Sequence, residues 1–247
     1  MAATQQALLM ASDNAVTVPE ACEADPYYSC GPTNDPYWSN VVLMLHMDGT
    51  DGATTFVDSS PAARTIAAFS SAQVDTANKK FGTGSGYFPT GTNSYLTTGD
   101  GYDMPGDFTV EFWLRLDTVT RAGQILFALT SPSSLNHFYI VAQTNGTASS
   151  IGVAVGSATI NDLTYDLVVN TWYHIAVARS GSTVTLFKNG VERGTTTTTF
   201  SPLSTRVGQV GYEVGTGNSL YGYIDDLRIT KGIARYTGNF NIPTAAF

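Results

Sequence analysis

Carboxylate side chains are the groups in this sequence best suited to catalysis. Glu111 lies in the strand-like segment Phe108–Leu116, in which apolar residues alternate with other types. A glycosidase that retains anomeric configuration needs two carboxyl groups about 5–5.5 Å apart, one as nucleophile and one as general acid. The neighbours of Glu111 on the same strand face are Trp113 and Arg115, so no second acid lies beside it. The sequence therefore predicts a protein that is not an enzyme.

Aspartates gather at two places in the sequence. Asp48, Asp51 and Asp58 lie close together early in the chain, and Asp225 and Asp226 are adjacent near its end. Ca²⁺ binds six to eight hard oxygen atoms, including carboxylates and loop carbonyls, so these two sets are suited to a calcium ion. The competing interpretation is that the Asp-Gly dipeptides at positions 48 and 51 form ordinary turns.

Strand alternation places the two adjacent aspartates on opposite faces. Asp225 shares a face with Leu227 and Ile229, within the strand-like segment Tyr221–Thr230. If those apolar residues face the core, Asp225 points inward, and a buried carboxylate needs hydrogen-bond donors or a cation. On the other face, Asp226 could instead pair with Arg228 or with water.

Histidines, cysteines and glycines offer no further reactive arrangement. His46, His137 and His174 are scattered, and each lies in or beside a strand pattern, which favours packing roles. The glycine-rich segment 82–86 lacks the lysine and the following helix of a phosphate-binding loop. Cys22 and Cys30 are separated by seven residues; they could form a local disulfide or remain two reduced thiols.

Composition excludes several classes of protein. The chain has 247 residues, with 12 Lys and Arg against 20 Asp and Glu, for a net charge of −8. This acidic balance argues against a nucleic-acid partner. Because hydrophobic residues make up 43% and charged residues only 13%, the chain is not a disordered acidic chain. No apolar run is long enough for a membrane span.

Short strand-like segments follow one another from Trp38 onward, and they must position the groups named above. Asn145-Gly146 and Asn189-Gly190 separate neighbouring segments, and Asn-Gly is a common hairpin turn. Roughly a dozen short strands at this spacing predict an all-β fold, a two-sheet antiparallel β-sandwich or jelly roll. The clearest segments are Val41–Met47, Phe108–Leu116, Gln124–Leu129, Phe138–Gln143, Ile151–Val155, Trp172–Arg179, Thr183–Lys188, Val191–Thr198, Arg206–Gly211 and Tyr221–Thr230.

Residues 1–37 form a predicted N-terminal arm, and residues 38–247 the folded domain. The arm lacks strand alternation, ends in a proline-rich stretch and carries apolar residues such as Leu8, Leu9 and Met10. It is either a disordered terminus or a segment that docks on another subunit. No signal peptide is recognisable, since residues 1–15 hold no Lys or Arg, so synthesis and folding in a cytoplasm are expected.

Five segments occur in the order and spacing of laminin-G-like jelly-roll domains, which belong to the concanavalin A-like lectin/glucanase superfamily. They are LMLHMDGTDG (43–52), KFGTGSGYFPTGTNSYLTT (80–98), DFTVEFWLRL (107–116), TWYHIAVARSGSTVTLFKNGVERG (171–194) and GYIDDLRITKGIARYTGNF (222–240). The resemblance covers roughly residues 40–247. The last segment most resembles versions found in tailed-bacteriophage and prophage gene products.

This resemblance implies a phage virion structural protein, either a capsid decoration or a fibre component. The arm, residues 1–37, would dock on other virion proteins, and the sandwich would point outward and help attach the particle to host surface glycans. A homo-oligomer such as a trimer would suit this role. The alternative is a carbohydrate-binding or adhesion module of a bacterial surface or secreted protein.

The resemblance also suggests site residues. Glucan-cleaving members carry two glutamates flanking an aspartate on one strand, a motif missing here. Related domains often hold Ca²⁺, and Asp48 and Asp225 best match the expected ligand positions, with Asp51, Asp58 and Asp226 as further candidates. A sugar would stack on exposed aromatic rings, but the spacing does not single out a platform. The nominal candidates are Trp113, Tyr139, Tyr212 and Tyr221.

Overall fold

The computed structural model describes residues 35–247, apart from 103, 122, 131–137, 200–206 and 213–216. Most of the predicted arm lies outside the described residues, and so do His137, Cys22 and Cys30. The division into an arm and a domain at residue 37 stays a prediction. None of the described helices has the length and apolar character needed to cross a bilayer.

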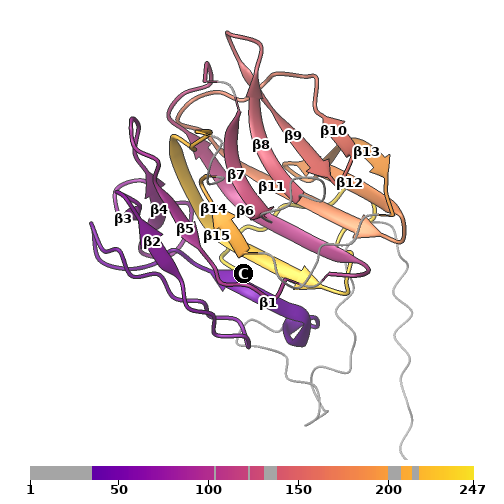
Figure 1. Cartoon of the computed structure of the whole chain (residues 1–247), viewed down its shortest axis with the longest axis horizontal. Helices are drawn as coiled ribbons and strands as arrows, with labels where there is room; N and C mark the ends of the chain where they lie inside the picture. Colours follow the sequence, from indigo (N-terminus) through magenta and orange to yellow (C-terminus); the bar gives the residue numbers. More distant parts are fainter. Residues whose placement is uncertain (1–34, 103, 122, 131–137, 200–206, 213–216) are drawn as a thin grey trace, which may run out of the picture.

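Two antiparallel sheets pack face to face, which confirms the predicted two-sheet β-sandwich (Figure 1). One sheet has eight strands in the order β13-β12-β11-β6-β15-β4-β3, with β1 also paired to β15; the other has seven, in the order β10-β9-β8-β7-β14-β5-β2. After a short 3-10 turn (η2, Trp38–Asn40), the strands are β1 (Val41–Leu45), β2 (Ala67–Phe69), β3 (Gln73–Asp75), β4 (Ser85–Phe88), β5 (Tyr95–Thr97), β6 (Phe108–Leu116), β7 (Gln124–Thr130), β8 (Phe138–Thr144), β9 (Ser149–Val155), β10 (Ala158–Asn161), β11 (Trp172–Ser180), β12 (Thr183–Lys188), β13 (Val191–Thr197), β14 (Val207–Val210) and β15 (Gly222–Lys231).

Alternating side chains of the central strands build the core between the sheets. In β6 the five inward residues are Phe108, Val110, Phe112, Leu114 and Leu116, all of which are buried in the main hydrophobic cluster. Phe108 meets Phe138 of the opposite sheet edge to face, with ring centroids 5.5 Å apart. Burying such a set of apolar side chains is the main force that holds two sheets together.

A bulge in β15 changes which of its residues face the core. Asp226 adopts a positive φ of 49°, and the pairing of β15 with β6 shifts register between Asp225 and Arg228. Because of this extra residue, Ile224 and Leu227 both point into the core. Asp225 therefore lies on the outer face with its neighbour across the sheet, Trp113. The prediction that Asp225 shares a face with Leu227 and Ile229 was wrong, because plain alternation does not foresee a bulge.

The outer faces of the two sheets differ. On the eight-stranded sheet, Tyr236 and Phe240 from the C-terminal segment pack on a cluster around Phe187. The chain end, Phe247, packs with Val41 and Met44 of β1, and Figure 1 places the C terminus beside that strand. The described C-terminal segment therefore covers much of this outer face. On the seven-stranded sheet, a small outward cluster of Ile125, Ala128, Val141 and Tyr139 lies over β7 and β8.

Candidate functional site

A surface depression of about 430 Å³ lies on the outer face of the seven-stranded sheet. Its volume is within the ~300–1,000 Å³ typical of small-ligand sites. Strands β7 and β8 form its base, the β10–β11 loop contributes one side, and the segment before Ser219, which bridges to β7, contributes the other. The lining residues are Gly123, Ile125, Tyr139, Val141, Gln143, Thr144, Tyr165 and Asn218.

Strand β8 positions three of these residues by alternation. Tyr139, Val141 and Gln143 point outward, while the residues between them, Ile140 and Ala142, are fully buried in the core. Because the inward side chains are fixed by packing, the outward ones are presented on a rigid base. These positions were within reach of the sequence, since the predicted strand Phe138–Gln143 has the same alternation.

Small residues on the neighbouring strands leave room around the outward side chains. Tyr139 is paired with Ala128 on β7 and with Ala154 on β9. The Gln143 side chain lies over Gly152, where a Cβ atom would come within 2.5 Å of Gln143 Nε2. The depression thus exists because bulky side chains are missing beside Tyr139 and beneath Gln143.

The lining combines apolar surface with neutral hydrogen-bonding groups. Ile125 and Val141 are largely buried and provide an apolar base. Gln143 and Asn218 each carry an amide that both donates and accepts hydrogen bonds. None of the lining residues is an acid, a lysine, an arginine or a histidine. Such a site is suited to an uncharged ligand that has both hydroxyl groups and apolar faces.

The predicted sugar-contacting aromatics have different surroundings. Tyr139 lines the depression. Tyr212 is buried, with its ring 5.5 Å from that of Tyr95. Tyr221 lies under the guanidinium of Arg121, 4.2 Å away.

Trp113 lies on the outer face of the other sheet. It is 1% exposed and has the Lys80 ammonium 4.1 Å from its ring centroid, so it offers no open face to a sugar. Of the lining residues, sequence reasoning named only Tyr139 as a candidate contact, and it missed those with other polar side chains, which are Gln143, Thr144, Tyr165 and Asn218. Tyr165 lies in the β10–β11 loop with a φ of 47°, and a loop carries no periodic signal that could have revealed it.

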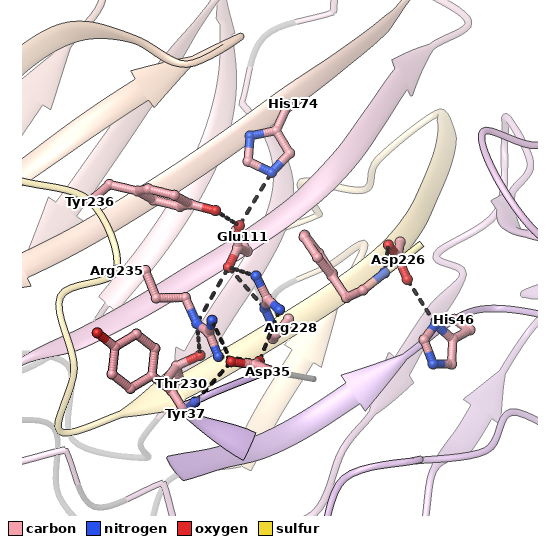
Figure 2. Close-up of polar contacts among 11 residues, drawn as sticks. Asp35, Tyr37, His46, Glu111, His174, Asp226, Arg228, Thr230, Arg235 and Tyr236 are labelled. Atoms are coloured by element: carbon pink, nitrogen blue, oxygen red, sulfur yellow. Dashed lines mark hydrogen bonds and ion pairs between the residues drawn. The ribbon is translucent and has the colours of Figure 1, made fainter. Parts of the chain in front are cut away.

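Glu111 lies within a buried ionic network on the outer face of the eight-stranded sheet (Figure 2). Arg228 donates from Nε at 3.0 Å and from Nη2 at 2.8 Å to Glu111 Oε1, and the Tyr236 hydroxyl donates to Oε2 at 2.7 Å. His174 Nε2 lies 3.3 Å from the same Oε2. Burial alone would raise the pKa of Glu111, but Arg228, His174 and Arg235 outweigh it and hold the pKa below its ordinary range. An ionised, fully buried carboxylate of this kind is not placed to protonate a substrate.

Asp35 balances the charge of the network. It accepts from Arg228 Nη1 at 3.2 Å and from Arg235 Nη1 and Nη2 at 3.1 and 2.6 Å. The Arg235 Nε donates to Thr230 Oγ1 at 2.6 Å, and the Tyr37 amide donates to Asp35. Two carboxylates thus neutralise two guanidinium groups, and together they fix the C-terminal segment to the sheet (Figure 2).

The early aspartates of the calcium prediction are hydrogen-bonded within their loops. Asp48 Oδ1 accepts from the amide and hydroxyl of Thr83 and from the Gly84 amide. Asp51 accepts from Thr76 N and Oγ1 at 3.1 and 3.3 Å. Asp58 accepts from four donors, the amides of residues 44, 60 and 64 and the hydroxyl of residue 60. Hydrogen bonds from protein donors therefore stabilise these carboxylate oxygens, which is the role that a bound cation would otherwise have.

The late aspartates have separate partners. Asp226 accepts from the Phe247 amide and lies 2.8 Å from His46 Nδ1, so it pairs with neither Arg228 nor a second acid. Asp225 is fully buried, and its Oδ2 accepts from the amides of Lys80 and Phe81 at 2.7 and 3.1 Å. Burial raises the pKa of Asp225 to about 7. Within the described ranges no group of three or more His, Cys, Asp or Glu could hold a metal ion, and calcium binding stays a prediction.

Solved structures with the same fold come from proteins of several kinds. Domain 4 of an extracellular GH43 arabinanase from Geobacillus stearothermophilus, in complex with arabinotriose, aligns with a TM-score of 0.60 and 18% identity over 78% of this chain and 93% of that chain. The botulinum neurotoxin type G receptor-binding domain aligns with a TM-score of 0.57 and 15% identity over 82% of this chain and 49% of that chain. A botulinum neurotoxin type C structure, whose description says that cell entry depends upon interaction with two ganglioside molecules, aligns with a TM-score of 0.57 and 14% identity over 78% of this chain and 48% of that chain. The chain thus spans about half of the toxin chains.

At these identities the shared feature is the fold. No curated protein matches the chain. Residues 90–233 match the family described as the concanavalin A-like lectin/glucanases superfamily. This match covers more than half of the 247 residues and confirms the resemblance noted in the sequence. The chain belongs to the concanavalin A-like lectin/glucanases superfamily.

Proposed function

We propose that this chain is a non-enzymatic glycan-binding module that holds a neutral sugar chain in the depression over β7 and β8. The observation that carries this proposal is the lining itself: two tyrosines and two carboxamides around an apolar base, with no charged residue. Sugars present hydroxyl groups at their edges and C–H groups on their faces. The amides of Gln143 and Asn218 suit the hydroxyl groups, and the rings of Tyr139 and Tyr165 suit the faces.

Charge favours a neutral glycan over an acidic one. The lining offers no Lys or Arg to a carboxylate or a sulfate. The chain as a whole carries a net charge of −8, which would slow the approach of a polyanionic glycan at low ionic strength. We therefore expect neutral polymers to be retained in preference to uronic-acid or sulfated ones.

The similar structures support a binding role. The arabinanase domain is described in complex with arabinotriose, and cell entry of the type C toxin is described as dependent upon interaction with two ganglioside molecules. Both descriptions name sugar-bearing ligands. For this chain the residues that would contact the sugar come from its own depression, because at such low identity no relative's site can be transferred residue by residue.

The proposal of a binding module rather than an enzyme rests on Glu111. Its side chain is 0% exposed and bound to Arg228 and Tyr236, on the opposite side of the sandwich from the depression. Acid catalysis by Glu111 would require both a route to solvent and loss of its ion pair. A glycosidase would also need a second carboxyl group at a suitable distance.

A glycan array followed by calorimetric titration tests the proposal. Tyr165→Ala and Gln143→Ala should each weaken binding of a retained neutral glycan by about tenfold, since each removes one stacking or hydrogen-bonding group. Tyr87→Ala is the matched control, because Tyr87 is half-buried on β4 of the other sheet, stacked on Tyr223. The proposal fails if the array retains no neutral glycan, or if the control weakens binding as much as the site variants.

The setting of the module is a separate proposal. From the resemblance of the segment 222–240 to phage proteins, we propose that the module is displayed on a virion, as a capsid decoration or fibre component, with residues 1–37 docked on other virion proteins. Its alternative is an adhesion module of a bacterial surface or secreted protein. A chain that lacks residues 1–34 should still bind glycan but no longer join phage particles. Incorporation of the shortened chain at normal levels would refute the docking role of the arm.

A further inference from the structure

Tyr165 reaches the depression from the β10–β11 loop, in a conformation that its own backbone disfavours. The loop is tied to β9 at two points: the Asp162 amide donates to the Ile151 carbonyl at 2.9 Å, and the Leu167 amide donates to the Ser149 carbonyl at 3.0 Å. Between these points Tyr165 has a φ of 47°, in the left-handed region that residues other than glycine rarely adopt. Contacts made by the neighbouring side chains must therefore hold the loop in this shape.

Two cations of the eight-stranded sheet bind the loop on both sides of Tyr165. Lys188, at the end of β12, donates from Nζ to Asp162 Oδ2 at 2.6 Å and to Thr164 Oγ1 at 3.2 Å, and it also donates to Asp166 Oδ1. Arg193 of β13 donates to the same three side chains: from Nε to Asp162 Oδ2 at 3.2 Å, and from Nη2 to Thr164 Oγ1 at 2.7 Å and Asp166 Oδ2 at 2.8 Å. We call these five residues, Asp162, Thr164, Asp166, Lys188 and Arg193, the loop clamp.

The burial of Lys188 makes the loop clamp costly to open. Lys188 follows Val184 and Leu186 on the inward face of β12, and its side chain is only 4% exposed. Burial alone would raise the pKa of Asp162, but hydrogen bonds from Lys188 and Thr164 outweigh burial and lower the pKa to about 2. Two ionised carboxylates thus meet two cations. Displacement of the loop would take both carboxylates away from a buried ammonium group, which is unfavourable.

The two cations of the loop clamp lie outside the depression. Neither Lys188 nor Arg193 lines it, and Figure 1 shows β10 beside β12 and β13 at one edge of the sandwich. The strands are close there, since a Cβ atom on Gly194 of β13 would lie 2.8 Å from Ile160 Cγ2 of β10. The loop clamp therefore joins the two sheets at this edge. Its cations are connected to the depression through the loop that carries Tyr165.

We propose that Lys188 and Arg193 are positioning residues for glycan binding, which hold the ring of Tyr165 at the depression before a sugar arrives. This inference rests on the proposed function. A loop that is already ordered loses little conformational freedom when the ligand binds, and this raises affinity. Because the two cations act on the sugar only through Tyr165, the affinity lost without them cannot exceed the loss that Tyr165→Ala causes.

Titration calorimetry with a neutral glycan that the array retains tests this inference by a double-mutant cycle. Arg193→Met and Asp166→Asn change partly exposed members of the loop clamp, and each should weaken binding about threefold. Combined with Tyr165→Ala, neither change should weaken binding further. Arg193→Lys keeps a cation near the carboxylates and should recover part of the affinity. Lys79→Met is the control, because it removes one positive charge from an exposed residue between β3 and β4, and it should leave affinity unchanged.

Two further measurements follow the loop clamp itself. Lys188→Met removes its buried cation and should weaken binding about tenfold, as Tyr165→Ala does. Thermal melting shows whether this variant folds, and if it does not, the Arg193 and Asp166 variants decide the question. Hydrogen exchange at the Thr164 amide, which donates to Asp162 Oδ1 at 3.0 Å, needs no sugar. It should be severalfold faster in Arg193→Met than in the wild type, and an unchanged rate would contradict the loop clamp.

The outcomes separate the inference from the proposed function. If Arg193→Met and Asp166→Asn bind the glycan as tightly as the wild type does, the positioning role is wrong and the proposed function stands. If they weaken binding equally with and without the Tyr165 ring, they do not act through Tyr165, and the positioning role is again wrong. If the wild type binds no neutral glycan, the proposed function is wrong, and the positioning role is refuted with it.

Discussion

Replacement of Arg228 by methionine should be among the most destabilising single changes outside the core. Arg228 makes two hydrogen bonds to Glu111 and one to Asp35, and the relevant side chains are 8% exposed or less. Methionine keeps the length of the side chain but leaves Glu111 as a buried charge without its main partner. Breaking a buried ion pair in this way costs about 3–5 kcal/mol. Arg235 Nε lies 3.8 Å from Glu111 Oε1 and should hold the cost near the lower end.

Urea unfolding followed by circular dichroism measures this loss. For a domain of this size we expect a fall of roughly 6–20 °C in the melting temperature as well. The matched control is Arg115→Met on the same strand face as Glu111. Arg115 pairs with the half-buried Asp117 at 3.2 Å, and such partly exposed pairs contribute about 0–1 kcal/mol. A double variant, Glu111→Gln with Arg228→Met, should be more stable than Arg228→Met alone, because it leaves no unpaired charge.

The pH dependence provides the sharper test. In the wild type the pKa of Glu111 is lowered in the folded state, so its ionised form contributes stability above the unfolded pKa and that contribution is lost as pH falls. Without Arg228, burial dominates and raises the pKa of Glu111, so the folded variant takes up a proton. The stability gap between wild type and Arg228→Met should therefore be larger at about pH 7 than at about pH 5. A gap below about 1 kcal/mol at neutral pH, or one that widens in acid, would refute the role assigned to the network.

Three further outcomes are expected. Burial raises the pKa of Asp225 to about 7, so the wild type should lose stability as pH rises from the unfolded pKa through about 7. Asp225→Asn should flatten this part of the pH profile of stability measured by urea unfolding. An unchanged slope would contradict the raised pKa of Asp225. Gly152→Ala should displace the Gln143 side chain, whose Nε2 lies 2.5 Å from the new Cβ position, and weaken glycan binding severalfold in calorimetry while melting stays within a few degrees. Excess Ca²⁺ should raise the melting temperature relative to EDTA if the calcium prediction is right, and identical melting curves in the two conditions would contradict that prediction.

The sandwich was predictable because its long strands carry their own pattern. The alternation in Phe108–Leu116 gave the inward residues of β6, and the two Asn-Gly dipeptides lie in the turns of the β8–β9 and β12–β13 hairpins. The nearly continuous apolar run of Val41–Met47 is typical of a strand buried on both faces, and Met44 and Leu45 of β1 belong to different buried clusters. Strands of three residues, such as β2, are too short to show alternation and were missed.

The candidate site was predictable only in part. Tyr139 was among the aromatic candidates, and Gln143 follows from the same strand pattern. The ion pair of Glu111 with Arg228 was not predictable, because Arg228 lies more than a hundred residues away and its position depends on the bulge at Asp226. Local sequence determines which face a side chain takes, but the pairing of strands distant in sequence determines what it meets there.

The buried network also affects the order in which the chain can fold during synthesis. Glu111 and Arg228 are 117 residues apart, and Asp35 and Arg235 are 200 apart. At a synthesis rate of about 5–20 residues per second, roughly 6–25 s pass between the synthesis of Glu111 in β6 and that of its counterion Arg228. Until then, closing the sheet over Glu111 would bury a charge without a partner. The central strand of the sandwich is therefore kept from completing its fold until the C-terminal segment has been released.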